Sequence, residues 1–242
     1  MQNFNTQLLL SYINMAYTIC LFRMKMILVD CIRFSCYYTM ICLVKRGETM
    51  AIKRLAVTGY KPQELGIFND THPGLAIIKK ALKDRLLLLI EDGLEWVLVS
   101  GQLGVETWVV DVVWELQEQY PQLQYGVMIP FLDQEKNWNE QKKAHYMEMM
   151  AKADFTTAIT NRPYEAPWQF VEKNKFFVLH SDAFLILYDE EQDGSPKYVK
   201  RLVETYIDKH NASYELLTID AYDLQMVAEE EQQRIWEQHE FE

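Results

Sequence analysis

Two glycine-bearing segments hold the residue types best suited to bind a ligand. The first is Thr58-Gly59-Tyr60-Lys61, which offers a backbone position without a side chain, an aromatic ring and a cation. The second begins at Ser100 and has glycines at positions 101 and 104, immediately before an apolar pattern of helical spacing. Glycine there permits positive φ and lets an anion approach the free amide groups of the first helical turn. The second segment therefore indicates a phosphate-binding site and the first a loop that could contact the same ligand, although ordinary turns contain the same residues.

The carboxylate of Glu106 falls in the first turn of this predicted helix. A carboxylate that pointed toward a bound phosphate would repel it. We therefore consider two ligand-directed roles: Glu106 accepts hydrogen bonds from ribose hydroxyls or a base edge, or it serves as a general base. The alternative is structural, because an acidic residue at a helix N-terminus is stabilised by the helix dipole.

Other residues of interest follow the later predicted strands. Phe131 could form one wall of a base pocket or simply cover the core, and Asn161 begins a segment in which Arg162 could bind a phosphate with both arms of its guanidinium. The acidic segment from Asp189 to Asp193 disfavours a second phosphate site but could hold hydroxyl groups or a divalent ion. The motifs GxGxxG, GxxxxGK[ST], GxSxG and HExxH are absent, and no two histidines lie four residues apart on a helix, so we predict no metal site.

These segments need a scaffold that brings strand ends together. From Met50 onward, short apolar runs alternate with longer amphipathic ones, as in repeated βα units. The predicted strands are Arg54–Thr58, Trp96–Ser100, Tyr125–Pro130, Phe155–Ile159, Ala183–Tyr188 and Tyr214–Ile219. The predicted helices are Pro73–Asp92, Val105–Tyr120, Asn139–Ala153, Pro167–Leu179, Pro196–His210 and Ala221–Gln238. This order predicts one α/β domain over 50–242: a three-layer, Rossmann-like sandwich with a mostly parallel sheet, helices on both faces and ligands beyond the C-terminal strand ends.

The composition differs between the first 49 residues and the rest. All four cysteines lie within positions 20–42. Residues 1–49 carry a net charge of +3; because the whole chain carries −11, residues 50–242 carry −14. So acidic a body disfavours sequence-independent binding to nucleic acid. The lack of cysteine in residues 50–242 excludes disulfides, thiol catalysis and cysteine-based zinc sites there. We therefore expect a reducing, cytoplasmic location.

Three interpretations of residues 1–49 are open. A membrane-spanning helix needs about 20 mostly apolar residues, whereas the uncharged run at 8–22 is shorter and includes polar side chains. A secretory signal needs basic residues before the apolar run and a small-residue cleavage pattern after it, and the sequence has neither. We favour the third interpretation, in which Met50 is the biological start and residues 1–49 are a non-native extension from an over-extended gene prediction.

Three blocks of the sequence resemble the YpsA family of the SLOG superfamily, a Rossmann-like group that also contains the DprA/Smf and LOG proteins. They are TGYKPQELGIF at 58–68, SGQLGVETW at 100–108, and KNKFFVLHSDAFLILYD at 173–189 with a DGSP turn after it. Order and spacing agree over essentially all of 50–242, and residues 1–49 lie outside the resemblance. Two departures stand out. The late turn reads DGSP where LOG enzymes have PGGxGTxxE, which argues against phosphoribohydrolase activity, and Ser100 stands where many members have a second glycine.

The resemblance implies a pocket for a nucleotide or a nucleotide derivative such as ADP-ribose or NAD. Members of the family are associated with cell division in Gram-positive bacteria, so we expect a protein partner in that process and no binding to nucleic acid or membrane. The positions that match the superfamily's binding residues are Gly59, Tyr60, Lys61, Gly101, Gly104 and Glu106, and further family-typical polar positions are Asn174, Asp182 and Asp189.

Three functions are compatible with these residues. The leading hypothesis is a nucleotide sensor or regulator with little or no enzymatic activity, because the two glycine-bearing segments come without a recognisable catalytic set. The second is a phosphoribohydrolase-like hydrolase of an N-glycosidic bond, in which Glu106 is the acid/base or oxocarbenium-stabilising carboxylate. The third is a scaffold that binds a partner through an acidic C-terminal helix at 228–242, where Ile235 and Trp236 are adjacent.

Overall fold

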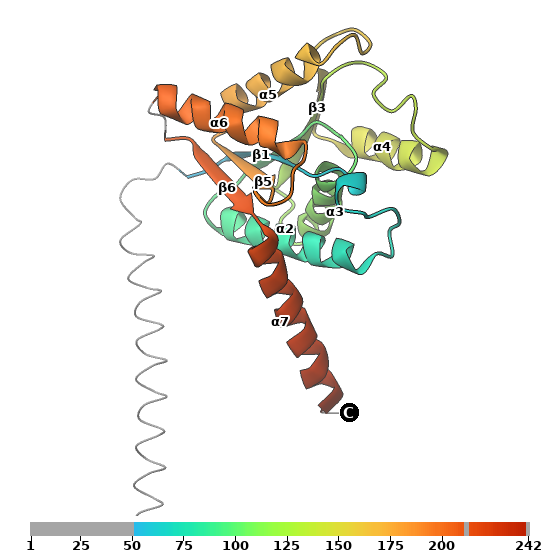
Figure 1. Ribbon diagram of the computed structural model, residues 1–242, viewed down its shortest axis with the longest axis vertical. Helices are drawn as coiled ribbons and strands as arrows, with labels where there is room; N and C mark the ends of the chain where they lie inside the picture. The colour runs from blue at the N-terminus through green and yellow to red at the C-terminus, as the bar shows by residue number, and fades with distance from the viewer. Residues whose placement is uncertain (1–50, 211–212, 241–242) are drawn as a thin grey trace, which may run out of the picture. The chain divides into compact units, whose positions relative to one another are not determined.

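Six parallel strands form the sheet at the centre of the computed structural model (Figure 1). Their order across the sheet is β4-β3-β2-β1-β5-β6, and every neighbouring pair is parallel. The strands are β1 (Arg54–Gly59), β2 (Trp96–Val99), β3 (Gln124–Ile129), β4 (Phe155–Ala158), β5 (Ala183–Leu187) and β6 (Glu215–Ile219). The predicted parallel α/β sheet is therefore confirmed, with strand ends within two residues of the expected ones.

Helices cover both faces of this sheet, which gives three layers. The helices α5 and α6 lie on one face, and α2 and α3 lie on the other (Figure 1). The full set is α2 (Pro73–Glu91), α3 (Val105–Gln117), α4 (Glu140–Lys152), α5 (Trp168–His180), α6 (Pro196–His210) and α7 (Ala221–Glu240), with a short 3-10 helix η1 (Pro62–Glu64) after β1. The predicted Rossmann-like sandwich is confirmed, whereas η1 is not among the predicted elements and the helix expected to reach Tyr120 ends at Gln117.

The central strands are apolar along their whole length because helices bury both of their faces. All five residues of β5 are buried, as are Leu55, Ala56 and Val57 of β1. Helix α3 is the most deeply packed helix, since nine of its residues are buried, including Val105, Val109, Val113 and Leu116. By contrast, β4 lies at one edge of the sheet and its four residues are exposed or half-buried.

The strand order reverses at β1, and this reversal determines where a ligand can bind. One neighbour of β1 is β2, reached through α2, and the other is β5, whose Leu187 lies opposite Gly59 in the register. Loops that leave the C-terminal ends of β1 and β5 therefore lead to helices on opposite faces. In open parallel sheets such a reversal leaves a crevice between the two loops, and ligands bind there.

The structure describes residues 51–210 and 213–240, and the prediction that residues 1–49 are a non-native extension lies outside them. The described residues belong to a compact unit that begins at Ala51. Within this part of the chain no helix is long and apolar enough to cross a membrane.

Candidate functional site

A cavity of about 520 Å³ opens at the C-terminal end of β1, where the strand order reverses. We call it the β1 cavity. The end of β1 and the loop after it contribute Thr58, Gly59 and Lys61, and the loop after β2 contributes Gln102. The first turns of α5 and the start of α6 complete the wall, with Pro167, Phe170, Val171, Lys173, Asn174, Ser195, Pro196, Tyr198 and Val199. The volume is in the range of small-molecule sites, which are mostly clefts of about 300–1,000 Å³.

Two lysines give the β1 cavity a positive character. Lys173 on α5 is only 4% exposed, and Lys61 is half-buried beside it. Burial lowers the pKa of Lys173, the carboxylate of Glu106 raises it, and the positive charge of Lys61 lowers it further. Both lysines line the same cavity, so an anion bound there would be attracted by both charges.

Asn174 lines the same cavity and has a buried hydrogen-bond acceptor that is not used. Its residue is 8% exposed, and its Oδ1 atom is buried without a hydrogen-bond partner among the described residues. A buried polar atom without a partner costs about 1–3 kcal/mol, so proteins rarely keep one without a use for it. Of the buried side-chain nitrogens and oxygens in the described part of the chain, it alone lacks a partner.

Glu106 is buried beneath the cavity and does not line it. Its Oε1 accepts a hydrogen bond from the Thr58 hydroxyl at 2.8 Å, and its Oε2 accepts from the Ser100 amide at 2.7 Å and the Ser100 hydroxyl at 2.6 Å. Lys173 Nζ lies 4.0 Å from Oε1. The carboxylate therefore holds the ends of β1 and β2 together and compensates the charge of the buried lysine.

The glycines of the two predicted segments allow close packing of backbone. As expected, Gly101 and Gly104 adopt positive φ, at 72° and 107°. A Cβ atom on Gly104 would lie 2.4 Å from the carbonyl oxygen of Tyr60, and one on Gly59 would lie 2.7 Å from a methyl group of Val105. Glycine is therefore required here because the end of β1 packs directly against the start of α3.

Tyr60 and Glu64 tie the loop after β1 to the loop after β5. The Tyr60 hydroxyl is 2.6 Å from the carbonyl oxygen of Gln192 and 3.0 Å from that of Asp189, as expected for hydrogen bonds that it donates. Glu64 accepts hydrogen bonds from the Ser195 amide at 2.8 Å and the Ser195 hydroxyl at 2.9 Å. These contacts close one side of the β1 cavity and hold the start of α6 against it.

Several of the predicted site residues do not line the β1 cavity. Phe131 packs against Phe170, with 5.4 Å between ring centroids, so it stands behind a cavity wall. Asn161 is exposed and does not line the cavity. Asp182 precedes β5 and therefore lies at the opposite edge of the sheet, where Arg54 Nη2 contacts its Oδ1 at 2.7 Å.

The chemistry of Asp182 fits this structural position. Burial raises its pKa, but the hydrogen bonds and positive charge of Arg54 lower it more, and the net pKa is below the usual value. Asp189 also has a local role, because its Oδ1 accepts from the amide of Glu191 at 2.9 Å. The structure thus brings together Thr58, Gly59, Lys61 and Asn174 on one cavity wall, with Ser100 and Glu106 behind it. Gly104 lines a second cavity, and Tyr60, Gly101 and Asp189 line neither.

Lys173 is not among the predicted site residues, although the sequence carries a signal for it. The buried face of α5 includes Gln169, Lys173 and Phe177, which recur at a spacing of four residues. Lysine is rarely fully buried unless its charge is paired, so a lysine in register with buried positions indicates an acidic partner inside the protein. It contacts Glu106, the one carboxylate that the sequence singles out beside the glycines.

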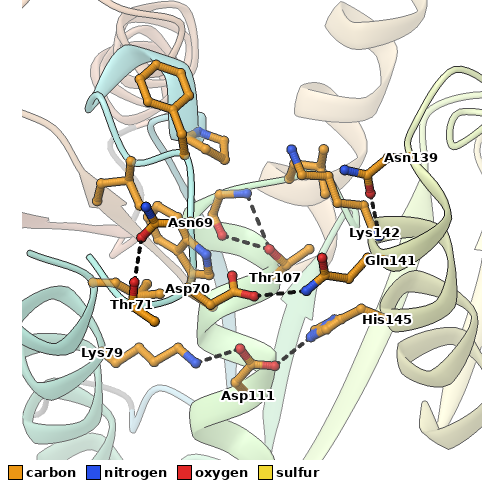
Figure 2. Close-up of a pocket in the computed structure, with 17 residues that line it drawn as sticks. Asn69, Asp70, Thr71, Lys79, Thr107, Asp111, Asn139, Gln141, Lys142 and His145 are labelled. Carbon is orange, nitrogen blue, oxygen red and sulfur yellow. Dashed lines mark hydrogen bonds and ion pairs between the residues drawn. The ribbon is translucent and has the colours of Figure 1, made fainter. Parts of the chain in front are cut away.

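A second cavity, of about 600 Å³, lies between the segment 67–71 and the helices α2, α3 and α4 (Figure 2). We call it the α4 cavity. Lys79, Asp111 and His145 form a row along it, with Asp111 in the middle: Lys79 Nζ lies 2.7 Å from Oδ2 and His145 Nε2 lies 2.7 Å from Oδ1 (Figure 2). No group of three or more potential metal ligands occurs within residues 51–210 and 213–240.

Comparison with known proteins shows the family to which the chain belongs. A family model described as the YspA SLOG family matches residues 55–224. A UPF0398 protein of Lysinibacillus sphaericus is 59% identical over 180 residues, which cover 74% of this chain and 99% of that protein. The UPF0398 protein YpsA of Bacillus subtilis is 47% identical over 180 residues, which cover 74% of this chain and 99% of that protein. A UPF0398 protein of Brevibacillus brevis is 49% identical over 185 residues, which cover 76% of this chain and 97% of that protein. The resemblance read from the sequence is confirmed, and the chain belongs to the YpsA family of SLOG proteins.

Proposed function

We propose that the β1 cavity binds a nucleotide or a nucleotide derivative such as ADP-ribose or NAD. The observation that carries the proposal is the pairing, in one cavity, of two neighbouring ammonium groups with a buried acceptor that has no partner among the described residues. Lys61 and Lys173 supply the charges, and Asn174 supplies the acceptor. A phosphate group can pair with the two lysines, and a hydrogen-bond donor of a base or a sugar can pair with the acceptor of Asn174.

The apolar part of the same cavity is suited to the base. Phe170 and Val171 of α5 face the cavity together with Tyr198 of α6, which is 63% exposed. A planar base can pack against aromatic and aliphatic groups of this kind, and its amino group donates to Asn174 Oδ1 when the buried amide turns toward the cavity. Lys61 and Lys173 then lie where the phosphate groups would bind. A nucleotide thus uses the charged, polar and apolar parts of the wall at once.

The environment of Glu106 supports a binding protein rather than an N-glycosidic hydrolase. A general acid or base must reach the substrate, whereas the Glu106 carboxylate is 3% exposed and accepts hydrogen bonds from Thr58 and Ser100. We therefore propose a nucleotide sensor or regulator. The process that it regulates, from the family resemblance, is cell division in Gram-positive bacteria.

Isothermal titration calorimetry of the full chain tests the proposal with AMP, ADP, ADP-ribose and NAD. At least one of these ligands is expected to bind saturably, and Lys61→Ala is expected to weaken it about tenfold or more because a charge-assisted hydrogen bond is lost. Lys53→Ala removes an exposed lysine near the opposite edge of the sheet and is the matched control. Absence of binding at about 1 mM, or equal loss in both variants, contradicts the proposal.

The C-terminal helix supports a second candidate function, the binding of a protein partner. The helix α7 contacts α2, but residues 232–238 are exposed, and Ile235 and Trp236 are 44% and 69% exposed. Tryptophan is enriched among the residues that contribute most of the binding energy at protein interfaces. Pull-down experiments with and without residues 228–242 test this function, which requires that the partner be lost with the truncation.

A further inference from the structure

The α4 cavity lies on the other side of the loop that follows β2, and the nucleotide proposal does not use it. Gln102 of this loop lines the β1 cavity, whereas the next two residues, Leu103 and Gly104, line the α4 cavity. After β1 the same division recurs, because Lys61 faces one cavity and Pro62 the other. The two cavities are therefore separate, and short stretches of backbone run between them.

The charged groups along the α4 cavity largely compensate each other. Asp111 lies between Lys79 and His145, at 2.7 Å from each. Its carboxylate is therefore already paired and does not need a positively charged group of a ligand. His145 also stacks on Trp114, with 5.7 Å between ring centroids, which fixes the ring beside the cavity. Outside this row the cavity is lined by one more lysine, Lys142, and one more carboxylate, Asp70, so its two lysines are matched by two carboxylates.

The remaining polar side chains are amides, hydroxyls, the carboxylate of Asp70 and the exposed ammonium of Lys142, and several have spare hydrogen-bonding capacity. Asp70 and Gln141 meet across the cavity, where Gln141 Nε2 donates to Asp70 Oδ2 at 3.2 Å (Figure 2). Neither Asp70 Oδ1 nor Gln141 Oε1 has a hydrogen-bond partner in the described part of the chain. Asn69 accepts from the Thr71 hydroxyl at 3.0 Å, which leaves its amide NH₂ group to donate. Donors and acceptors are thus mixed on one rim.

Apolar surface faces these polar groups. Trp108 and Ile67 form part of the wall, and Phe68 beside them is 77% exposed. A sugar ring has this combination of needs: each hydroxyl both donates and accepts a hydrogen bond, and the C–H faces of the ring pack against apolar or aromatic side chains. We propose that the α4 cavity is a second ligand site, which binds an uncharged, hydroxyl-rich glycosyl group, either of a free sugar or of a nucleoside.

Saturation-transfer NMR and calorimetry of the full chain test the second site with D-ribose, N-acetylglucosamine and adenosine as probes. At least one probe is expected to bind saturably at about 10 mM or below. Asp70→Ala and Gln141→Ala should each weaken it about tenfold, because each removes a hydrogen-bonding partner at the cavity rim. Asp208→Ala, which removes an exposed carboxylate of α6, is the matched control and should leave the affinity unchanged. Binding of the two sugars together with adenosine indicates the glycosyl group itself, whereas adenosine alone indicates a nucleoside, and either supports the site.

Three results would overturn the inference. The first is that none of the three probes binds saturably. The second is that binding survives Asp70→Ala and Gln141→Ala but is lost in Lys61→Ala, which would assign the probe to the β1 cavity. The third is that a small zwitterion, glycine, binds in the α4 cavity and loses this binding in Asp70→Ala, while the two sugars and adenosine do not bind. The cavity would then be a site for a charged ligand. Because Asp70 and Gln141 are exposed, their variants are expected to fold like the parent chain.

Discussion

Lys173 and Glu106 face each other in the protein interior, with 4.0 Å between Nζ and Oε1, at 6% and 4% side-chain exposure. Lys173 lines the β1 cavity and Glu106 lies behind it. The carboxylate thus offsets much of the cost of keeping a cation at a buried position where a ligand can reach it. Lys173 is therefore available to the ligand, and Glu106 stabilises the charge of Lys173.

Replacement of Glu106 by glutamine should destabilise the protein strongly. The amide cannot compensate Lys173, and its NH₂ group cannot accept from Ser100, so we expect a loss of about 3–5 kcal/mol in the free energy of unfolding, measured by urea denaturation. Addition of Lys173→Met to this variant should restore part of the loss. Glu115→Gln, which removes an exposed ion pair with Lys83, is the control and should cost about 1 kcal/mol or less. If Glu106→Gln and Glu115→Gln lowered the free energy of unfolding by similar amounts, the role given to Glu106 would be refuted.

Asn174 should show opposite effects on binding and on stability. Asn174→Ala removes a buried acceptor that has no partner among the described residues, so the free energy of unfolding should stay constant or rise by about 1 kcal/mol while nucleotide affinity falls about tenfold. Ser181→Ala is a fitting comparison, because Ser181 Oγ lies 2.7 Å from the Phe177 carbonyl and 2.6 Å from the Tyr214 hydroxyl. That variant should lose about 1 kcal/mol without loss of affinity. Thermal and calorimetric measurements on both variants decide whether the pattern holds.

Gly66 and Gly104 both have positive φ, but they differ in ψ-dependent backbone strain and in the space beside them, so their alanine variants should differ in cost. Gly66 has a φ of 67°, and nothing lies within 4 Å of the place that a Cβ atom would take, whereas a Cβ on Gly104 would meet the Tyr60 carbonyl oxygen. Gly66→Ala should therefore cost about 1–2 kcal/mol, the usual penalty for the left-handed region. Gly104→Ala should cost at least about 2 kcal/mol more, or prevent folding. Equal unfolding free energies for the two variants would mean that the Tyr60–Gly104 contact is not tight.

Stability should fall as the pH rises above 10, in part because of Tyr146. Burial raises the pKa of Tyr146 to about 12, against an opposing effect of its hydrogen bond from Gln134. Between pH 10 and about 12 the unfolded chain releases this proton and the folded chain keeps it, so the contribution is complete below pH 10 and is lost through that window. Urea denaturation in this range should show a shallower fall for Tyr146→Phe. Tyr222→Phe, at an exposed position, should reproduce the parent curve.

The sequence predicts the scaffold well because hydrophobic periodicity determines it. The apolar runs that form β1 and β5 are uninterrupted, as expected for strands covered on both faces, and the valines of α3 recur at helical spacing. Gly101 and Gly104 are predicted for the correct backbone reason, positive φ. Periodicity cannot predict which atoms lie beside these glycines. Beside Gly104 they belong to the loop after β1, with the carbonyl oxygen of Tyr60 nearest.

The site is less predictable because it depends on contacts between distant segments. The ligand-directed roles of Glu106 require a free carboxylate, but Thr58 and Ser100 supply donors that occupy it. Lys173 is one of many lysines in the sequence, and only the packing of α5 shows that it is buried. Asp182 can be placed from topology alone, because a residue before a parallel strand lies at the edge opposite to the residues that follow such strands.

A crystal structure of the full chain with the tightest-binding nucleotide would show directly whether the β1 cavity is the nucleotide site. We expect the phosphate groups to lie within hydrogen-bond distance of Lys61 and Lys173, and a donor of the base or sugar to reach Asn174 Oδ1. A nucleotide that occupies the α4 cavity, or that binds without contact to Lys61, Lys173 and Asn174, would contradict this assignment.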